Sequence, residues 1–594
     1  MHTQHIALLL ILGATLVLFA WGRVRFDIVA IGALLGAVLA GVVPADQAFA
    51  GFGHPAVITV AAVLILSRAL HTSGIVDAIV RLLKPLNARP RLLILSITGL
   101  AAACSAFMNN VGALALFLPI TLQSAEASKR PASQLLMPLS FGTLLGGLTT
   151  LIGTPPNIII ASIRQAEVGQ GFAMFDFAPV GLGIAVVGIL FVSLLGWRLL
   201  PARERAPADQ ESSARFHIED YITEVRLPED SPLVGRRLVD LETLGQGDVA
   251  VVALIRRKDR MLAPSSYLRL LGGDILIIEA DAAALQAVVE EAKLDTIGAA
   301  QISIENLHSD RVTVAEAVIA PGSPMEGRTA RSLRLHTNYG VNLLGVARQG
   351  APIIERLGRV RLRTGDVLLL QGERAAMPEA LAALGCLPLA AREIPLGRRS
   401  SSPAVPLVFA VAIALVASGL LAPQIAFVGA VAVLVASRQI NLRELYDSVD
   451  WPVIVLLGAL IPVGAAMETT GAARAFIQPL LAIENHVPPW TVLMLVMVAT
   501  MLLSDVMNNA ATAVIMAPIG IGVANGLGVS VDPFLMAVAV GASSTFLTPI
   551  GHQSNLLVMG PGGYRFGDYW RMGLPLDILI VAVAVPLILV VWPL

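Results

Sequence analysis

Two short polar stretches interrupt apolar runs and carry the groups best suited to bind an ion. TLIGTPPN at 150–157 and LTPIGHQSN at 547–555 each combine glycine, proline, a hydroxyl group and a final asparagine. Proline cannot donate a backbone hydrogen bond and glycine permits unusual dihedral angles, so each stretch should break a helix and free backbone carbonyl groups. Such carbonyls, with hydroxyl and amide oxygens, can hold a small cation. A proline kink filled by helix packing is the alternative.

Two asparagine pairs form the second candidate site. FMNNVGALALFLPI at 107–120 contains Asn109 and Asn110, and VMNNAATAVIMAPI at 506–519 contains Asn508 and Asn509. At the tip of a helical hairpin, amide groups and the N-terminus of the following helix can donate hydrogen bonds to an anion. Asparagine can equally hold two helices together inside a membrane. The recurrence of the pair favours the anion site.

The elements that position these groups are membrane helices. The chain has 594 residues, of which 56% are hydrophobic and 14% charged, where a soluble domain has about 25% charged residues. Many apolar runs approach the ~20 residues that cross a bilayer. We expect a polytopic α-helical membrane protein that retains a first helix over 5–20. The two cysteines imply no disulfide framework.

Three blocks follow one another along the chain. The first and last blocks are apolar, and the middle block is rich in charge, with strand-like runs such as DILIIEA and DVLLLQG. SPLVG at 231–235 returns as SPMEG at 323–327, which predicts a tandem α+β insert. The expected domains are membrane repeat 1 at 1–204, two cytoplasmic modules at 205–300 and 301–398, and membrane repeat 2 at 399–594.

The two apolar blocks repeat each other. Asn157 and Asn555 are 398 residues apart, and Asn109 and Asn508 are 399 apart. We interpret each block as five crossings and one re-entrant hairpin. An odd number of crossings turns the second copy upside down, which is the inverted repeat of secondary transporters. The expected crossings are 5–20, 26–43, 55–72, 134–163, 178–198, 404–420, 422–437, 452–470, 534–559 and 574–592, with hairpins at 91–122 and 489–524.

Basic residues orient this arrangement. They cluster in the loops that this parse places inside, which predicts a multi-pass protein of the inner (plasma) membrane with a cytoplasmic insert and both termini outside. The inside residues are Arg23, Arg25, Arg81, Lys84, Arg89, Lys129, Arg130, Arg203, Arg205, Arg438, Arg443, Arg565 and Arg571, against Arg164 and Arg474 outside.

These patterns lead to named site residues. The anion site would use Asn109, Asn110, Asn508, Asn509, Thr154 and Thr548. The two sodium sites would use Asn110, Gly153 and Asn157 in one half and Asn509, Gly551 and Asn555 in the other. Asp505 could bind a cation or a proton, or lie at a hydrated helix end. No nucleotide-binding loop or metal-binding Cys/His spacing is apparent, so we expect no enzyme and no cofactor beyond Na⁺ as coupling ion.

These motifs resemble the divalent anion–sodium symporter family. G-T-P-P-N in the fifth crossing, S-N in the tenth and paired hairpins ending in Pro-Ile carry the resemblance, over both apolar blocks. FLTPIGHQSNLLVMGPGGYRFGDYWRMGLPL at 546–576 looks most like the branch of sulfur-limitation sulfate transporters. The resemblance implies a homodimer with scaffold and transport domains that works as an elevator. The family has Ser-Asn-Thr at each tip, whereas this chain has Asn109-Asn110-Val111 and Asn508-Asn509-Ala510 and so lacks those hydroxyl groups.

The insert is similar to the C-terminal ligand-binding (RCK-C, TrkA-C-like) module of potassium-conductance regulators. The S-P-x-x-G opening and a Gly-Asp pair before an apolar strand are the matching features. The similarity implies a small-molecule regulator that binds these modules; a purely structural role in dimerisation is equally compatible.

The sequence thus predicts a sodium-coupled symporter for a small divalent anion. Its expected partners are the anionic substrate, Na⁺, a second copy of the chain and a small-molecule regulator, with no nucleic acid. The alternatives are a proton-coupled or efflux oxyanion permease, a ligand-gated ion channel, and an anion sensor that has lost transport.

Overall fold

The computed structural model describes most of the chain. The described residues are 2–21, 24–73, 90–128, 130–201, 222–244, 249–256, 259–262, 264, 267–280, 282–299, 312–348, 351–353, 357, 360–374, 376–389, 403–441, 445–446, 448–470 and 488–594. The predicted domain borders lie outside these residues, as do the predicted loop residues Arg23, Arg81, Lys84, Arg89, Lys129, Arg203, Arg205, Arg443 and Arg474.

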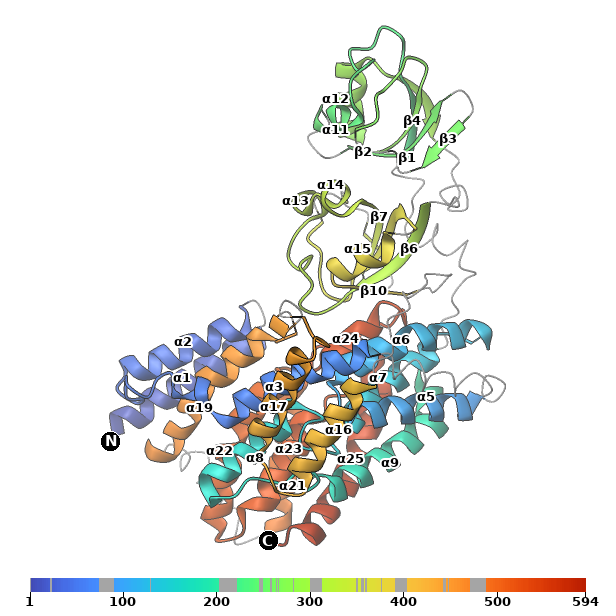
Figure 1. Cartoon of the computed structure of the whole chain (residues 1–594). Helices are drawn as coiled ribbons and strands as arrows, with labels where there is room; N and C mark the ends of the chain where they lie inside the picture. Colours follow the sequence, from blue (N-terminus) through green and yellow to red (C-terminus); the bar gives the residue numbers. More distant parts are fainter. Residues whose placement is uncertain are drawn as a thin grey trace.

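Two sets of helices form a single body (Figure 1). The first set is α1 (His2–Trp21), α2 (Phe26–Leu39), α3 (Pro55–Thr72), α5 (Pro90–Ser105), α6 (Asn110–Ala127), α7 (Ser133–Gly147), α8 (Pro155–Val168) and α9 (Ala178–Leu194). The second set is α16 (Ala404–Ala417), α17 (Pro423–Ala436), α19 (Trp451–Thr470), α21 (Pro489–Ser504), α22 (Asn509–Leu527), α23 (Val531–Ser543), α24 (Gln553–Met559) and α25 (Tyr569–Val591).

Local sequence explains where these helices begin and end. Helices α8 and α17 begin at Pro155 and Pro423, where the missing N–H group has no partner to lose. Several predicted crossings are longer than the observed helices; for example, the predicted crossing 178–198 contains α9, which ends at Leu194. Helix α2 ends at Leu39 and α16 at Ala417, because Gly41 and Gly419 follow with φ angles of 66° and 73°, which stop a right-handed helix.

Both predicted breaks interrupt a helix. The predicted crossing 134–163 consists of α7 and α8, joined by residues 148–154, here called the first break. The predicted crossing 534–559 consists of α23 and α24, joined by 544–552, the second break. The connections between α5 and α6 (106–109) and between α21 and α22 (505–508) are here called the first tip and the second tip.

Helix packing recurs between the two sets. Helix α5 packs on α7 and α9, as α21 packs on α23 and α25. Between the sets, α2 packs on α19 as α17 packs on α3, and α8 packs on α22 as α24 packs on α6. The two sets are therefore interleaved, and each break packs beside the helix that follows the opposite tip.

Glycine permits the closest of these contacts. A Cβ atom on Gly142 of α7 would lie 2.8 Å from the carbonyl oxygen of Thr98 in α5. A Cβ atom on Gly541 of α23 would lie 2.8 Å from the carbonyl oxygen of Met497 in α21. Both pairs are 399 residues apart in sequence. Small residues that let helix backbones approach are typical of membrane helix packing.

Two five-stranded antiparallel sheets lie between the helical sets in sequence. The first has the order β3-β2-β4-β1-β5 and the second the order β10-β6-β9-β7-β8, which is the same order when equivalent strands are compared. The strands are β1 (Ile222–Arg226), β2 (Val249–Arg256), β3 (Asp259–Leu262), β4 (Ile275–Ala280), β5 (Asp295–Ala299), β6 (Val312–Ile319), β7 (Val341–Arg348), β8 (Ala351–Pro352), β9 (Val367–Glu373) and β10 (Cys386–Pro388). The helices are α11 (Leu238–Leu244), α12 (Ala282–Ala292), α13 (Ala330–Leu333), α14 (Leu335–Tyr339) and α15 (Met377–Ala383).

The same ion pair stabilises both sheets. Arg256 Nε and Asp274 Oδ1 are 2.8 Å apart in the first sheet, and Arg348 Nε and Asp366 Oδ1 are 2.7 Å apart in the second, 92 residues later. The Asp274 carboxylate raises the pKa of the Arg256 guanidinium through this hydrogen bond. These repeated contacts explain why the Gly-Asp pairs recur in the sequence.

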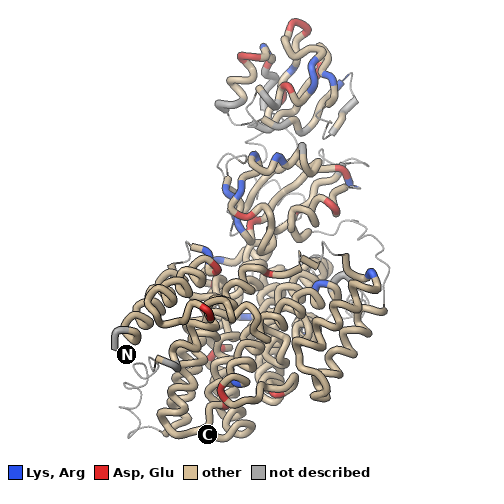
Figure 2. Tube along the Cα trace, turned by 60° about the vertical axis from the view of Figure 1, so that its left-hand side comes forward, with Lys and Arg blue, Asp and Glu red and all other residues tan. Residues whose placement is uncertain are grey.

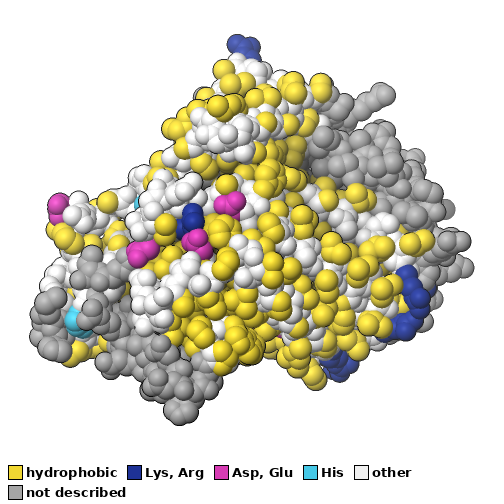
Figure 3. Space-filling view, turned by 90° about the horizontal axis from the view of Figure 1, so that it is seen from below, with side chains coloured by type: hydrophobic (Ala, Val, Ile, Leu, Met, Phe, Trp, Pro, Cys, Tyr) yellow, Lys and Arg dark blue, Asp and Glu magenta, His cyan; other side chains and the backbone are white. Residues whose placement is uncertain are grey.

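Charge separates the sheets from the helices. Charged residues are common in the sheets and sparse in the helical body (Figure 2). The helical face remote from the sheets is mostly hydrophobic (Figure 3). Among the described residues, Asn509–Leu527 and Phe566–Val591 are long and apolar enough to cross a bilayer, and several shorter apolar helices accompany them.

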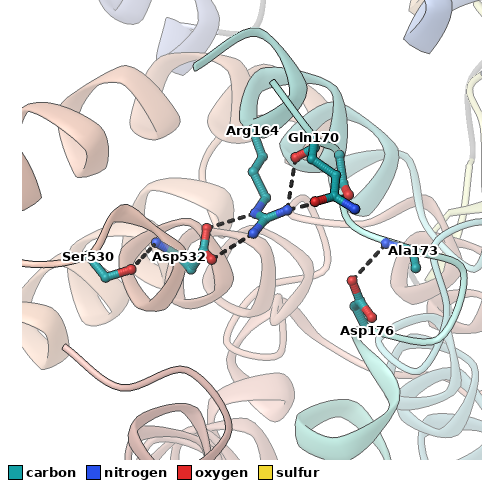
Figure 4. A network of polar contacts seen from close by, with 7 residues as sticks. Arg164, Gln170, Ala173, Asp176, Ser530 and Asp532 are labelled. Carbon is teal, nitrogen blue, oxygen red and sulfur yellow. Dashed lines mark hydrogen bonds and ion pairs between the residues drawn. The ribbon is translucent and has the colours of Figure 1, made fainter. Parts of the chain in front are cut away.

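Arg164 ties the two helical sets together away from the sites. It reaches from α8 to Asp532 at the start of α23, with 2.7 Å between Nε and Oδ1 and 2.8 Å between Nη2 and Oδ2 (Figure 4). Its Nη1 donates to the carbonyl oxygen of Gln170 at 2.8 Å. The guanidinium carbon lies 4.6 Å from the ring centroid of Phe172. The side chain therefore fixes the end of α8 against α23.

Candidate functional site

The first tip is held by its own asparagines. The backbone N–H group of Val111 donates to Asn109 Oδ1 at 3.1 Å, which caps the start of α6. The backbone N–H group of Asn109 donates to Ser67 Oγ of α3 at 3.1 Å. Asn109 therefore sets both the start of α6 and the position of the tip against α3.

Asn110 joins the first tip to the first break. With its Nδ2 turned inward, the amide donates to Ser105 Oγ at 2.7 Å, to the carbonyl oxygen of Thr143 at 3.2 Å and to that of Gly153 at 3.3 Å. The opposite orientation would direct the amide oxygen at two carbonyl oxygens. A Cβ atom on Gly147 would lie 2.6 Å from the end of this amide, so glycine at 147 leaves room for it.

Asn157 replaces the backbone donors that the first break removes. Its Nδ2 donates to the carbonyl oxygens of Thr150 at 2.8 Å and Gly147 at 3.4 Å. Thr150 Oγ1 in turn donates to the carbonyl oxygen of Ala106 in the first tip. Unpaired carbonyl groups in a membrane cost several kcal/mol each, so an asparagine at this position compensates for the interrupted helix.

The same contacts recur at the second break. Asn555 Nδ2 donates to the carbonyl oxygens of Thr545 at 2.8 Å and Thr548 at 3.3 Å. Thr548 Oγ1 donates to the carbonyl oxygen of Asp505 in the second tip at 2.6 Å. Thr545, Thr548 and Asn555 are each 398 residues after their counterparts in the first break. The repeated asparagine thus has one local role in both halves.

Buried oxygens without partners lie at both breaks. Within the part of the chain that the structure describes, Thr154 Oγ1 and Asn157 Oδ1 make no hydrogen bond at the first break. Asp505 Oδ2, Thr545 Oγ1 and Ser554 Oγ make none at the second. Thr154 and Asn157 are each 1% exposed. Buried polar atoms normally have partners, so these oxygens are candidate ligands for a cation.

The two breaks differ in one respect. Ser140 Oγ of α7 donates to Asn555 Oδ1 at 2.7 Å, so the side-chain oxygen of Asn555 is already engaged by the other helical set. Asn157 Oδ1 has no such donor among the described residues. Of the two predicted asparagine ligands, Asn157 therefore has the side-chain oxygen that is open to a cation.

The second tip presents amides near the start of α22. The backbone N–H group of Ala510 lies 2.9 Å from both Asn508 Oδ1 and Asn509 Oδ1. Asn508 and Thr548 are partly exposed, whereas Asn509 is buried. Stretches 105–112, 147–157, 504–512 and 544–555 contain no Arg or Lys. An anion bound here would therefore meet neutral donors and helix N-termini rather than a cationic side chain.

Comparison with known proteins shows the family to which the chain belongs. The family model described as "Citrate transporter" (CitMHS) matches residues 16–541 and 488–594. The chain belongs to the CitMHS citrate transporter family. It is therefore a mainly helical membrane transporter and not an enzyme. The resemblance to divalent anion–sodium symporters is confirmed at the level of the family.

Relatives of this CitMHS transporter match most of its length. An uncharacterized transporter of Synechocystis sp., sll0640, is 34% identical over 585 residues, which is 96% of this chain and 94% of that protein. A putative sulfur deprivation response regulator of Chlamydomonas reinhardtii is 28% identical over 587 residues, covering 95% and 98%. Sodium/sulfate cotransporter 1 of the same alga is 25% identical over 350 residues, covering 55% of this chain and 39% of that protein.

Several residues of the candidate site were missed from sequence. Ser105, Ser140, Gly147 and Thr545 contact the predicted asparagines but were not among the predicted residues. Ser105 and Ser504 are 399 residues apart, as are the paired asparagines of the tips. This shared offset could have identified Ser105 as a site residue. Ser140 joins the two helical sets, and the sequence gives no sign of that contact.

A separate cavity of the CitMHS transporter lies away from the tips. It is partly open and lies between α3, α8, α19 and α22. His54, Ser162 and Glu167 are its polar lining residues, and Ile159, Gly464 and Pro518 are among the apolar ones. The cavity contains none of the predicted site residues.

Proposed function

We propose that this chain is a secondary active transporter that brings a small divalent anion, sulfate or a dicarboxylate, into the cell together with Na⁺. One observation carries the proposal. Two breaks at equivalent places hold carbonyl groups satisfied by an asparagine, beside buried oxygens that have no partner among the described residues. The sodium/sulfate cotransporters among its relatives support this choice of ions.

We propose two Na⁺ sites and one anion site. The first Na⁺ site would use Asn110, Gly153 and Asn157, with Thr154 Oγ1 as a further ligand. The second would use Asn509, Gly551 and Asn555. The anion would bind between the tips, near Asn109, Asn508 and Thr548. Bound Na⁺ would supply positive charge to an anion site whose tips and breaks contain no Arg or Lys.

We propose further that the helical sets are inverted repeats. The recurrence of helix packing and of the hydrogen bonds at both breaks supports duplication. The expected odd number of crossings supports inversion, with α5–α6 and α21–α22 as re-entrant hairpins. The two sheets would be cytoplasmic modules inserted at 205–300 and 301–398, with both termini outside.

The proposed transport mode is an elevator. Helices α5–α9 and α21–α25 pack mainly on one another, and so do α1–α3 with α16–α19. Contacts between these groups run through α3, α6, α8, α19 and α22, and all of these helices except α6 also border the cavity. The first group would move as the transport domain against the second as scaffold, in a homodimer.

Uptake into proteoliposomes tests this proposal. The purified chain should take up labelled sulfate, succinate or citrate faster with an inward Na⁺ gradient than with an equal K⁺ gradient. The variants Asn157→Leu and Asn555→Leu should lose this stimulation, and liposomes without protein give the background. Uptake that follows pH but ignores Na⁺ would replace sodium coupling by proton coupling. No uptake of any of the three anions would overturn the proposal.

We propose that the second sheet regulates transport through α24. A Cβ atom on Gly560, just after α24, would lie 2.7 Å from the carbonyl oxygen of Gly365 in the turn before β9. A Cβ atom on Gly365 would lie 3.1 Å from the carbonyl oxygen of Leu556 in α24. Figure 1 shows this sheet beside that end of the helical body. Because α24 is seven residues long, its far end is the second break.

Variants at Gly560 test the regulatory contact. Gly560→Val should push the sheet away, change the rate of Na⁺-driven uptake at least severalfold, and raise hydrogen exchange in β9. Gly567→Ala is the matched control, because its nearest neighbour is 4.0 Å from the new Cβ atom. Unchanged uptake in Gly560→Val, together with raised exchange in β9, would show that the contact has no regulatory role.

A further inference from the structure

His552 lies where the second break meets the first tip. It is the N-cap residue of α24 and follows its counterpart Thr154 by 398 residues. Thr154 makes no side-chain cap for α8, whereas the His552 ring accepts from the backbone N–H group of Ser554 at 3.0 Å. The His552 ring therefore caps its helix, a role that Thr154 does not have in the first helical set.

The cap fixes the tautomer of the ring. Because Nδ1 accepts the hydrogen bond from Ser554, it bears no proton, and the neutral ring has its proton on Nε2. Nε2 lies 3.4 Å from the terminal amide of Asn110. An Nε2–H group requires an acceptor, so the amide oxygen of Asn110 must face His552.

A second, independent observation gives the same orientation. Only with Oδ1 directed at His552 does Nδ2 of Asn110 donate to Ser105, Thr143 and Gly153. Asn110 therefore has its amide occupied on both sides when no cation is bound: the nitrogen by the first break, and the oxygen by the second.

A cation at the first break is incompatible with this orientation. A cation bound to the carbonyl oxygen of Gly153 would repel the N–H groups of Asn110 and attract its Oδ1. Turning the amide would direct Nδ2 at His552, so that two donors would face each other. The Nε2–H group would then be left without its acceptor, in a site without any arginine or lysine.

We propose that His552 is the substrate-binding donor of this transporter and that Asn110 masks it until Na⁺ occupies the first site. An oxyanion oxygen would replace Asn110 Oδ1 as the acceptor of the Nε2–H group. This inference rests on the proposed function, because it assumes Na⁺ at the first break and an anion between the tips. It adds a donor from the second break and a physical reason for cation-dependent anion binding.

Two variants separate the capping role of His552 from donation to the anion. Asparagine places an oxygen where Nδ1 lies, so His552→Asn keeps the cap and loses the donor. Glutamine places an N–H group at the reach of Nε2, so His552→Gln keeps the donor and weakens the cap. Anion KM, the melting temperature and its shift by Na⁺ are measured for each variant and for the wild type.

The expected pattern is specific. His552→Asn should raise the anion KM by about tenfold to a hundredfold, as for a lost hydrogen bond to a charged group. Its melting temperature without Na⁺ should fall, because Asn110 Oδ1 loses its donor, and its Na⁺-induced shift should be at least as large as that of the wild type, because no bond to His552 then opposes turning of the Asn110 amide. His552→Gln should keep the anion KM within about threefold of the wild type and melt at a lower temperature.

Each other result overturns a different statement. An unchanged anion KM in His552→Asn would refute the role of His552 while leaving the proposed function intact. Loss of the Na⁺-induced shift in both variants would make His552 a structural residue and would also refute it. If wild-type protein shows the Na⁺-induced shift but transports no anion, the proposed function itself fails.

Discussion

The side-chain amides of Asn157 and Asn555 donate hydrogen bonds to backbone carbonyl oxygens that an unbroken helix would pair with backbone N–H groups. Each bonds two carbonyl oxygens around its break, at 2.8 and 3.4 Å for Asn157 and at 2.8 and 3.3 Å for Asn555. A helix broken inside a membrane needs such compensation because no water is available there. The break therefore survives as a site with fixed carbonyl groups and does not become a loose loop.

The first prediction compares two threonines of the first break. Thr154 Oγ1 is buried without a partner among the described residues, whereas Thr150 Oγ1 donates to the carbonyl oxygen of Ala106. Thr154→Val should leave the stability without Na⁺ unchanged or slightly higher, because an unpaired buried hydroxyl costs about 1–3 kcal/mol. Thr150→Val should lose about 1 kcal/mol. Thermal unfolding in detergent measures both.

A titration with Na⁺ completes this comparison. Stabilisation by Na⁺ should weaken in Thr154→Val, because a ligand oxygen is lost, and persist in Thr150→Val. If Thr154→Val destabilises the Na⁺-free chain as much as Thr150→Val does, its hydroxyl has a structural partner and is not a ligand.

Sequence reasoning located most of these residues but not their bonding. The shared offset of 398 residues placed Asn157 with Asn555, and Thr154 and Thr548 were predicted as site residues, whereas Thr150 was not. It could not show that Asn555 Oδ1 accepts from Ser140 while Asn157 Oδ1 stays open, because that contact joins residues 415 positions apart in different helical sets. Whether an oxygen is engaged depends on such packing.

Among the elements, α5 and α7 pack at a distance that only glycine allows. A Cβ atom on Gly146 of α7 would lie 2.6 Å from the carbonyl carbon of Ala102 in α5. Helix α7 is buried along almost its whole length and ends at the first break. Its separation from α5 therefore determines where the first break lies relative to the first tip.

The second prediction tests this packing. Gly146→Ala should destabilise the chain by about 1–3 kcal/mol, because the added methyl group forces the helices apart. Gly99→Ala in α5 is the matched control, since nothing lies within 4 Å of its new Cβ atom. The control should gain up to about 1 kcal/mol from the higher helix propensity of alanine. Equal melting temperatures for the two variants would refute the packing argument.

The third prediction concerns His336 in α14, the helix that packs on β7 of the second sheet. Burial lowers the pKa of His336 below its ordinary value of 6.5, and the hydrogen bond with Asn342 opposes this effect less strongly. Unfolded chain therefore binds a proton near pH 6.5 that the folded chain does not bind. Stability from this residue is present above pH 6.5 and is lost as the pH falls below it.

Hydrogen exchange of the full chain checks this pH dependence. Between pH 7.5 and 5, protection of α14 and β7 should fall more in the wild type than in His336→Gln, after correction for the intrinsic exchange rate. Equal losses in both proteins would show that another group causes the effect.

The sequence predicted strands correctly where an apolar run is bounded by residues that end a strand. DILIIEA and DVLLLQG indicated strands that are observed as β4 and β9. The order of five strands in each sheet was not predictable, because non-neighbouring strands pair through contacts that local patterns do not encode. Helix ends were overextended at Gly41 and Gly419, where hydropathy continues although the backbone turns.

At the scale of the molecule, the two helical sets interlock. Tyr564 Oη accepts from the backbone N–H group of Met137 at 2.9 Å, Ser140 reaches Asn555, and Arg164 reaches Asp532. Each contact joins a residue of the first set to one of the second. The sequence offsets predict a duplication, but they could not predict this interlocking, because a repeat shows which elements are equivalent and not which ones touch.

The last prediction measures how strongly Arg164 couples the two sets. A double-mutant cycle of Arg164→Ala and Asp532→Ala should give a coupling energy of about 1–3 kcal/mol, because the side chains are only 13% and 17% exposed and the pair is bidentate. Arg25 and Asp27 form the matched control pair, with exposures of 66% and 14%, and should couple by less than about 1 kcal/mol.

Added salt distinguishes a buried ion pair from an exposed one, because it weakens mainly the exposed pair. Because Na⁺ is the proposed cargo, the cycle is repeated at constant Na⁺ with added choline chloride, which screens exposed charges. The coupling of Arg164 with Asp532 should persist, while that of the control pair should vanish. A coupling near zero for Arg164 and Asp532 at low salt would mean that this ion pair does not help to hold the sets together, and that the end of α8 can move against α23 without losing a stabilising contact.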